Sequence, residues 1–158
     1  MLTFEIMLLC TALLLAPVFI AFRNMLQQRD SMFLQMLLGY TVCYFMKNFY
    51  ALVNRAVNGI ENDGLEMDLI AMLGTIFFLI AAEFCLCHLS EGCKSRKGTS
   101  KKMLQVFLLV GTIAMVMEGV AGALENQILF IACYLVSVFC IYAVTIKTRT
   151  KAKDAKKF

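Results

Sequence analysis

Five long apolar segments follow one another along this chain of 158 residues, and they constrain its fold more than any other feature. A helix needs about 20 mainly apolar residues to cross about 30 Å of hydrocarbon, because each residue adds about 1.5 Å. Each segment is long enough to do so and is bounded by polar residues. The predicted spans are 2–22, 32–57, 66–88, 103–123 and 127–146. We therefore predict an all-α integral membrane protein, a bundle of about five transmembrane helices.

The composition agrees with lipid as the solvent. Hydrophobic residues make up 61% of the chain and charged residues 16%, with a mean hydropathy of +0.77, which exceeds the apolar share of soluble domains. The first segment could be taken for a signal peptide. However, no Lys or Arg precedes it, it contains Glu5, and it lacks a small-residue cleavage site, so we expect a retained helix.

The polar triplet Glu125-Asn126-Gln127 divides the longest apolar stretch. The stretch 103–146 is about twice as long as one membrane crossing requires, so it must hold two antiparallel helices joined by a tight turn. Residues 1–146 are thus expected to form the bundle. Residues 147–158 follow the last span, and we predict that they form a basic cytoplasmic tail.

The Lys and Arg residues predict the orientation, because positively charged loops stay in the cytoplasm. All 15 except Lys47 and Arg55 lie in three segments that alternate with acidic ones. These basic residues are Arg23 and Arg29, then Lys94, Arg96, Lys97, Lys101 and Lys102, and finally Lys147, Arg149, Lys151, Lys153, Lys156 and Lys157. The alternation fits five spans, with the amino end outside and the carboxyl end in the cytoplasm.

The net charge of +4 raises the alternative of nucleic-acid binding. Aromatic residues are not interleaved with the basic ones as a stacking platform requires, and no fold or motif that reads bases is present. Contacts with anionic lipid headgroups, each worth on the order of 1 kcal/mol, explain the basic residues better. The predicted partners are the lipid bilayer, in the cell membrane, and either a second copy of the chain or another membrane protein, without nucleic acid.

Ionisable residues inside the spans are the candidates for function, because each costs about 2.5–3.5 kcal/mol at mid-bilayer and usually faces the bundle interior. They are Glu5, Lys47, Glu83 and Glu118. In the predicted topology Lys47 and Glu118 lie at matching depth in the outer half, and Glu5 lies slightly closer to the outer surface. A Lys47–Glu118 pair with Glu5 nearby is therefore the predicted polar site.

Helical spacing adds neighbours to this pair. One polar and aromatic stripe along the second segment, which should face protein or water, consists of Tyr40, Cys43, Tyr44, Lys47, Tyr50 and Asn54. On the fourth segment one face of small residues surrounds Glu118 and would let another helix come close; it consists of Gly111, Ala114 and Gly122. The residues predicted to bind a ligand or ion are Lys47, Glu118, Glu5, Tyr44 and Asn54. The alternative is that Lys47 and Glu5 reach the outer interface, or that the ion pair only locks helices together.

Glu83 lies in the inner half of the third segment without an evident cationic partner at its depth. Removal from water disfavours a charged carboxylate, so a neutral, proton-carrying Glu83 is one hypothesis. A neutral Glu that is hydrogen-bonded within a helix contact is the alternative.

Three thiols and the only His gather near the cytoplasmic end of the same segment. They are Cys85, Cys87, His88 and Cys93, which are weak candidates for zinc or monovalent copper. Their spacing is not the paired Cys-x-x-Cys arrangement of structural zinc modules, so no metal site is predicted. Lipid modification of a cytoplasmic-face Cys, or ordinary packing, are the alternatives.

No nucleophile and base arrangement, phosphate-binding glycine loop or HExxH pattern is present, so neither enzymatic activity nor a cofactor is predicted. The first remaining function is a non-catalytic membrane protein that binds a small solute, ion or lipid for sensing or transport. The second is a membrane scaffold or accessory subunit whose intramembrane charges are structural. The polar stripe is richer than packing alone requires, which favours the first.

Overall fold

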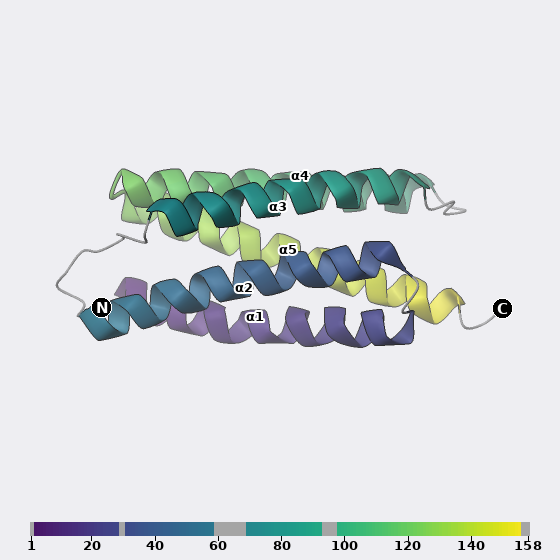
Figure 1. The fold of residues 1–158 in the computed structure, drawn as a ribbon, viewed down its shortest axis with the longest axis horizontal. Helices are drawn as coiled ribbons and strands as arrows, with labels where there is room; N and C mark the ends of the chain where they lie inside the picture. Colours follow the sequence, from purple (N-terminus) through teal and green to yellow (C-terminus); the bar gives the residue numbers. More distant parts are fainter. Residues whose placement is uncertain (1, 29–30, 59–68, 93–97, 156–158) are drawn as a thin grey trace.

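The computed structural model describes residues 2–28, 31–58, 69–92 and 98–155, and within these ranges every regular element is an α-helix. The helices are α1 (Leu2–Gln27), α2 (Met32–Asn58), α3 (Leu69–Gly92), α4 (Gly98–Ala123) and α5 (Gln127–Ala155) (Figure 1). The prediction of an all-helical bundle is confirmed for this part of the chain.

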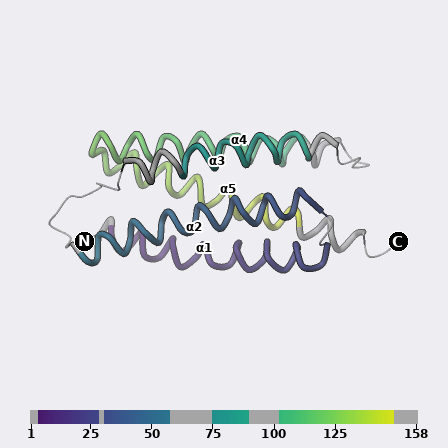
Figure 2. The backbone as a smooth tube through the Cα atoms, viewed as in Figure 1, coloured from purple at the N-terminus to yellow at the C-terminus, as the bar shows by residue number. Residues whose placement is uncertain are grey.

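The helices alternate in direction, so the two ends of the chain lie at opposite ends of the bundle (Figure 2). Each helix packs against its neighbours in the chain, and α5 also packs against α1, which closes a ring of five. In Figure 1, α5 runs diagonally between the α3/α4 pair and the α1/α2 pair. The ring places side chains of non-adjacent helices opposite one another across its centre.

The helices are longer than the predicted spans. α1 continues to Gln27 rather than ending near residue 22, and α4 begins at Gly98 rather than at residue 103. α5 continues to Ala155, so most of the segment predicted as a separate tail is helical. The reason is that membrane thickness limits the apolar stretch but not the helix, and this segment contains no Gly or Pro to end it. Residues 66–68, predicted to open the third helix, lie outside the described residues.

The predicted tight turn joins α4 to α5. Asn126 N–H donates to Ala121 O at 2.9 Å and Glu125 N–H donates to Gly122 O at 3.1 Å, the two bonds of a Schellman motif. Glu125 adopts a positive φ of 54° at the position where Gly is usual. Asn126 then caps α5, because its Oδ1 accepts a bond from Leu129 N–H at 3.1 Å.

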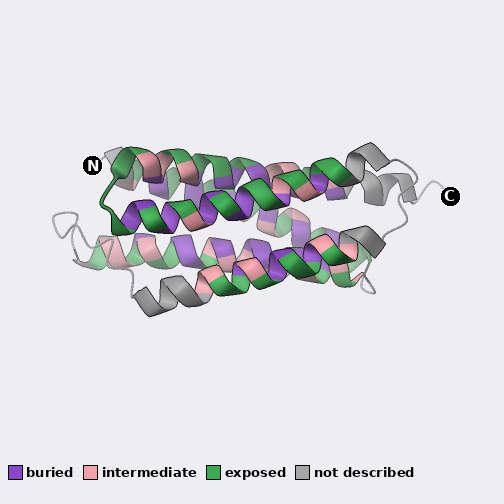
Figure 3. Ribbon diagram, turned by 90° about the horizontal axis from the view of Figure 1, so that it is seen from above, coloured by how far each residue is buried: buried purple, intermediate pink, exposed green. Residues whose placement is uncertain are grey.

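Buried and exposed residues alternate along each helix (Figure 3). Many of the exposed residues are apolar, whereas several polar residues are buried in the interior. On α2 the exposed positions include Met46 and Phe49, whereas Thr41 and Asn48 are buried. A soluble bundle shows the opposite distribution. Large apolar side chains are exposed along α1, α4 and α5 as well.

Among the residues that the structure describes, three helices are long and apolar enough to cross a membrane: Phe4–Gln27, Lys102–Ala123 and Gln127–Thr148. α3 contributes a shorter apolar stretch, Thr75–Leu89. α2 is not among them, because the polar residues of its buried stripe lower its hydropathy. Helix length and composition therefore support three of the five predicted membrane spans.

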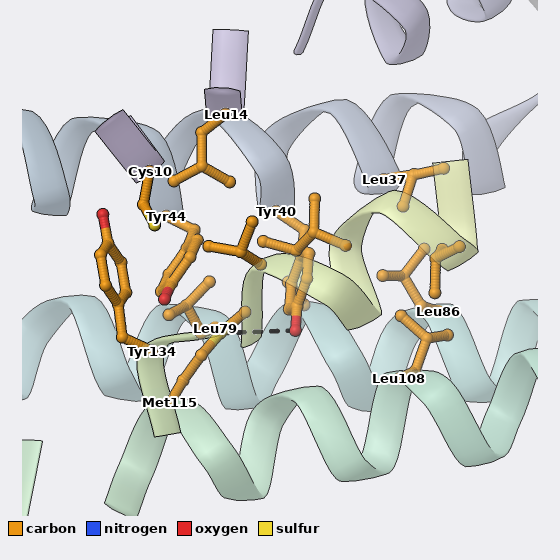
Figure 4. Close-up of a cluster of buried hydrophobic side chains, with 14 of the residues drawn as sticks. Cys10, Leu14, Leu37, Tyr40, Tyr44, Leu79, Leu86, Leu108, Met115 and Tyr134 are labelled. Carbon is orange, nitrogen blue, oxygen red and sulfur yellow. Dashed lines mark hydrogen bonds between the residues drawn. The ribbon is translucent and has the colours of Figure 1, made fainter. Parts of the chain in front are cut away.

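Leu and aromatic side chains form the core between the helices (Figure 4). Leu37, Leu86 and Leu108 join α2, α3 and α4 near one end, and each is at most 1% exposed. Toward the other end the core becomes polar, where Tyr44 and Tyr134 lie close together. This change along the bundle axis positions the candidate site.

Candidate functional site

Lys47 and Glu118 form an ion pair inside the bundle. Lys47 Nζ lies 2.7 Å from Glu118 Oε1, and the two side chains are 4% and 1% exposed. The Tyr44 hydroxyl donates a hydrogen bond to the other carboxylate oxygen, Oε2, at 2.8 Å. We call Lys47, Glu118 and Tyr44 the central polar cluster. The structure thus brings together three of the five residues predicted for the site.

Local sequence explains how the helices present these groups. Tyr44 and Lys47 are three residues apart on α2, so they share one face. Gly111, Ala114 and Gly122 are buried on the Glu118 face of α4, as predicted. α2 and α4 pack chiefly against other helices of the ring, so only long side chains can join them across the centre. Lys and Tyr from α2 and Glu from α4 have the required length.

The geometry satisfies the charges of this pair. Each carboxylate oxygen of Glu118 receives a donor, and Lys47 Nζ also lies 5.5 Å from the centroid of the Tyr44 ring, a cation–π contact. Removing charges from water costs several kcal/mol per ion, which only a close pair with further hydrogen bonds offsets. Loss of one partner would leave an uncompensated buried charge.

A shell of polar groups from α1, α2 and α5 surrounds the cluster. The Tyr134 ring lies 6.4 Å from the Tyr44 ring, centroid to centroid (Figure 4). The Tyr134 hydroxyl lies 3.2 Å from Thr11 Oγ1. Asn48, 1% exposed, donates through Nδ2 to Tyr44 O at 2.9 Å. Sequence reasoning missed Thr11, Asn48 and Tyr134. Asn48 lies one residue from Lys47 and four from Tyr44, a signal that could have found it.

The structure does not bring Glu5 to this cluster. The buried positions of α1 include Met7, Cys10, Thr11 and Leu14, a three- and four-residue repeat that leaves Glu5 on the exposed face. The predicted nearness of Glu5 to Lys47 and Glu118 is therefore wrong, because depth along a helix does not specify its face.

Two residues of the predicted stripe, Tyr50 and Asn54, are less buried than Tyr40, Tyr44 and Lys47. Asn54 is partly buried, two turns from Lys47 toward the end of α2. Tyr50 is 51% exposed and belongs to the outer face of α2.

A second chain of polar groups joins α2, α4 and α3. The Tyr40 hydroxyl lies 3.3 Å from Thr112 Oγ1. It also donates to Met115 Sδ at 3.5 Å (Figure 4). Thr112 lies beside Glu83, which is 6% exposed. Oε1 of the Glu83 carboxyl is buried without a hydrogen-bond partner. A proton-carrying role of Glu83 stays a prediction.

The weak metal candidates lie on different parts of the α3 surface. Cys85 and His88 are exposed, whereas Cys87 is partly buried. The two thiols differ because they are two residues apart, about 200° around the helix. Cys93 lies outside the described residues. Within the described ranges no three His, Cys, Asp or Glu side chains gather in a way that could hold a metal.

No family model, curated protein or solved structure matches this chain. The site described above therefore supplies the argument for function.

Proposed function

We propose that this chain is a non-catalytic multi-pass membrane protein that binds a small solute, ion or lipid for sensing or transport. The observation that carries the proposal is the closed ion pair between Lys47 and Glu118 in the interior of a bundle with an apolar surface. Such a distribution of polarity is typical of a protein whose solvent is hydrocarbon.

In the proposed topology all five helices cross the cell membrane, with the amino end outside. α2, which is less apolar, is included because its polar face is turned inward: Tyr40, Tyr44 and Lys47 are buried, and Phe49 is exposed. The ends of α1 and α3, the start of α4 and the end of α5 share one end of the bundle, which is the basic one. This arrangement agrees with retention of positive charge in the cytoplasm.

The central polar cluster is proposed as the binding site. An anion would replace Glu118 at Lys47, and a cation or a proton would replace Lys47 at Glu118. Either exchange releases the connection between α2 and α4, so occupancy of the site changes how these helices are held. A charge exchange of this kind keeps each buried charge compensated.

The melting temperature of the purified protein in detergent tests this proposal. It is measured in sodium, potassium, chloride and phosphate salts at constant ionic strength, for the wild type and for Lys47→Met with Glu118→Gln. A bound ion at hundredfold excess over its dissociation constant adds about 2.7 kcal/mol of stability. We expect one ion to raise the melting temperature of the wild type specifically and not that of the double variant.

A second function, a scaffold or accessory subunit, is favoured by one specific observation. Both oxygens of Glu118 already have donors, and the pair is almost completely enclosed, as expected of a structural brace. In that case each single variant, Lys47→Met or Glu118→Gln, loses about 3–5 kcal/mol, while the double variant regains most of it. Melting temperatures that follow this pattern and are the same in all salts would favour the scaffold.

A further inference from the structure

A groove separate from the central polar cluster opens between α3 and α4. Its volume is about 370 Å³, within the range of roughly 300–1,000 Å³ for small-molecule sites. Its lining residues include Glu83, Phe84, Leu109, Thr112, Ile113 and Met117. Phe84, Leu109 and Ile113 are 74%, 56% and 55% exposed, so the groove is open to the surface of the bundle. In a membrane this surface faces lipid.

The buried polar groups of the groove are Glu83 and Thr112, 6% and 7% exposed. Thr112 Oγ1 lies 3.3 Å from the Tyr40 hydroxyl oxygen on the inner side of α4. Glu83 Oε1 has no hydrogen-bond partner. A buried acceptor without a donor costs about 1–3 kcal/mol, and more where it carries charge. A donor supplied from the groove would remove this cost.

We infer that the groove binds an apolar molecule that ends in a hydrogen-bond-donating head, either a hydroxyl or an ammonium group. Glu83 Oε1 lies just beneath the apolar surface of the groove, so a rotation of the Glu83 side chain brings it to the head, which then donates to it. The apolar part of the molecule lies along Phe84, Ile113 and Met117. An anionic head is disfavoured, because no Lys, Arg or His lines the groove to offset the Glu83 carboxyl. A plain hydrocarbon chain would fill the volume and leave Oε1 without a donor.

This inference rests on the proposed membrane location but not on the role of Lys47 and Glu118. The groove is lined by α3 and α4 alone, whereas the ion pair joins α2 to α4. Failure of ion binding at the central polar cluster would therefore leave the groove proposal intact, and the reverse also holds.

The absence of Trp from the sequence allows a selective fluorescence test. A Phe84→Trp variant places the single indole at the rim of the groove. A Phe139→Trp variant places the indole on the exposed face of α5. This position lies at a depth similar to that of the groove, because the next residue, Cys140, packs on Gly111, which precedes the groove residue Thr112. Both variants are incorporated into phosphatidylcholine nanodiscs and titrated with bromododecanol, bromododecylammonium and bromododecane, which quench indole fluorescence on contact.

We expect at least one donor-bearing probe to quench the Phe84→Trp variant at about tenfold lower concentration than the Phe139→Trp variant. Bromododecane, which lacks a donor, should quench both variants equally. Adding Glu83→Met should abolish the preference. Adding Glu83→Gln instead keeps a carbonyl acceptor but removes the charge. If this variant loses only the preference for the ammonium probe, the wild-type groove binds that probe through an ion pair. If it keeps the preference for the hydroxyl probe, the groove accepts a neutral head.

Equal quenching of the two reporters by all three probes would overturn the inference. So would a preference for the groove that bromododecane shares, since this would identify an ordinary lipid chain as the occupant. The comparison between probes needs no change at Glu83, so it decides the matter even if Glu83→Met does not fold.

Discussion

Tyr44 is the residue that completes the ion pair. Its hydroxyl supplies the second donor of the Glu118 carboxylate, and its ring lies beside the Lys47 ammonium group. Hydrogen bonds to charged groups are stronger than hydrogen bonds between neutral groups. Loss of this bond would leave Oε2 of the Glu118 carboxylate buried without a donor. A single phenol oxygen therefore controls how well the buried charge is tolerated.

Replacement of Tyr44 by Phe should destabilise the protein by about 1.5–3 kcal/mol, because Glu118 Oε2 loses its donor while the ring is kept. Equilibrium unfolding in mixed micelles measures this change. Tyr50→Phe on the same helix is the matched control, and it should change stability by less than about 0.5 kcal/mol because Tyr50 is 51% exposed. Equal losses for the two variants would contradict the assigned role of Tyr44.

The turn between α4 and α5 allows a second test at a single residue. Glu125 has a φ of 54°, a conformation that costs an L-residue energy and that Gly adopts freely. Glu125→Gly should therefore stabilise the protein by about 0.5–1 kcal/mol, after the greater freedom of Gly in the unfolded chain is subtracted. Leu124→Gly in the same turn is the control and should be destabilising, since no positive φ is recorded for Leu124.

At the scale of elements, the close approach of α4 and α5 decides the shape of the bundle. A Cβ atom built at Gly111 would lie 3.1 Å from Cys140 Cβ and 3.6 Å from the Tyr40 hydroxyl oxygen. Small residues at a helix contact let backbones come close in a membrane, where packing rather than the hydrophobic effect holds helices together. The position of α4 relative to α5 in turn sets where Glu118 meets Lys47.

Substitution of Gly111 by Leu should separate α4 from α5 and cost about 1–3 kcal/mol through overpacking. Gly39 on α2 is the control, because a Cβ atom there meets no atom within 4 Å. Gly39→Leu should leave stability unchanged or raise it by up to about 1 kcal/mol, since Leu favours helix over Gly. Thermal unfolding of both variants in one detergent measures the difference. A tolerated Gly111→Leu would mean that the two helices are not held closely at this point.

At the scale of the whole molecule, the five described helices run antiparallel, so the ends of α1, α3 and α5 and the start of α4 share one end of the bundle. Two separate polar contacts join α2 to α4 across the interior, one at Glu118 and one at Thr112. The apolar exterior is continuous with the rim of the α3–α4 groove, so ligands of that groove would enter from the side.

Reporter fusions test this topology. Fusions that end at Gln28 and at Phe158 should report the cytoplasm, and a fusion that ends at Asn126 should report the outside, because positive charge is retained inside. A cytoplasmic enzyme and a secreted enzyme as alternative reporters provide the internal control. If the Asn126 and Phe158 fusions report the same compartment, the chain does not cross the membrane between them and the five-span proposal fails.

Hydropathy and spacing along the sequence by themselves determined the number of helices, the turn at Glu125 and Asn126, and the depth of Lys47 and Glu118. These are local properties, since a run of apolar residues specifies its own helix and rise per residue specifies depth. The buried face of α4, with Gly111 and Ala114, also followed from spacing.

Only the tertiary structure decided which helices lie beside or across from one another. Ring closure by α1 and α5 turned Glu5 outward and brought Tyr134 and Thr11 to the cluster. It also placed Thr112 against Glu83 and left one carboxyl oxygen without a partner at a groove. These outcomes depend on the rotation of each helix about its axis. That rotation is set by side-chain packing between segments far apart in the sequence, which no single segment encodes.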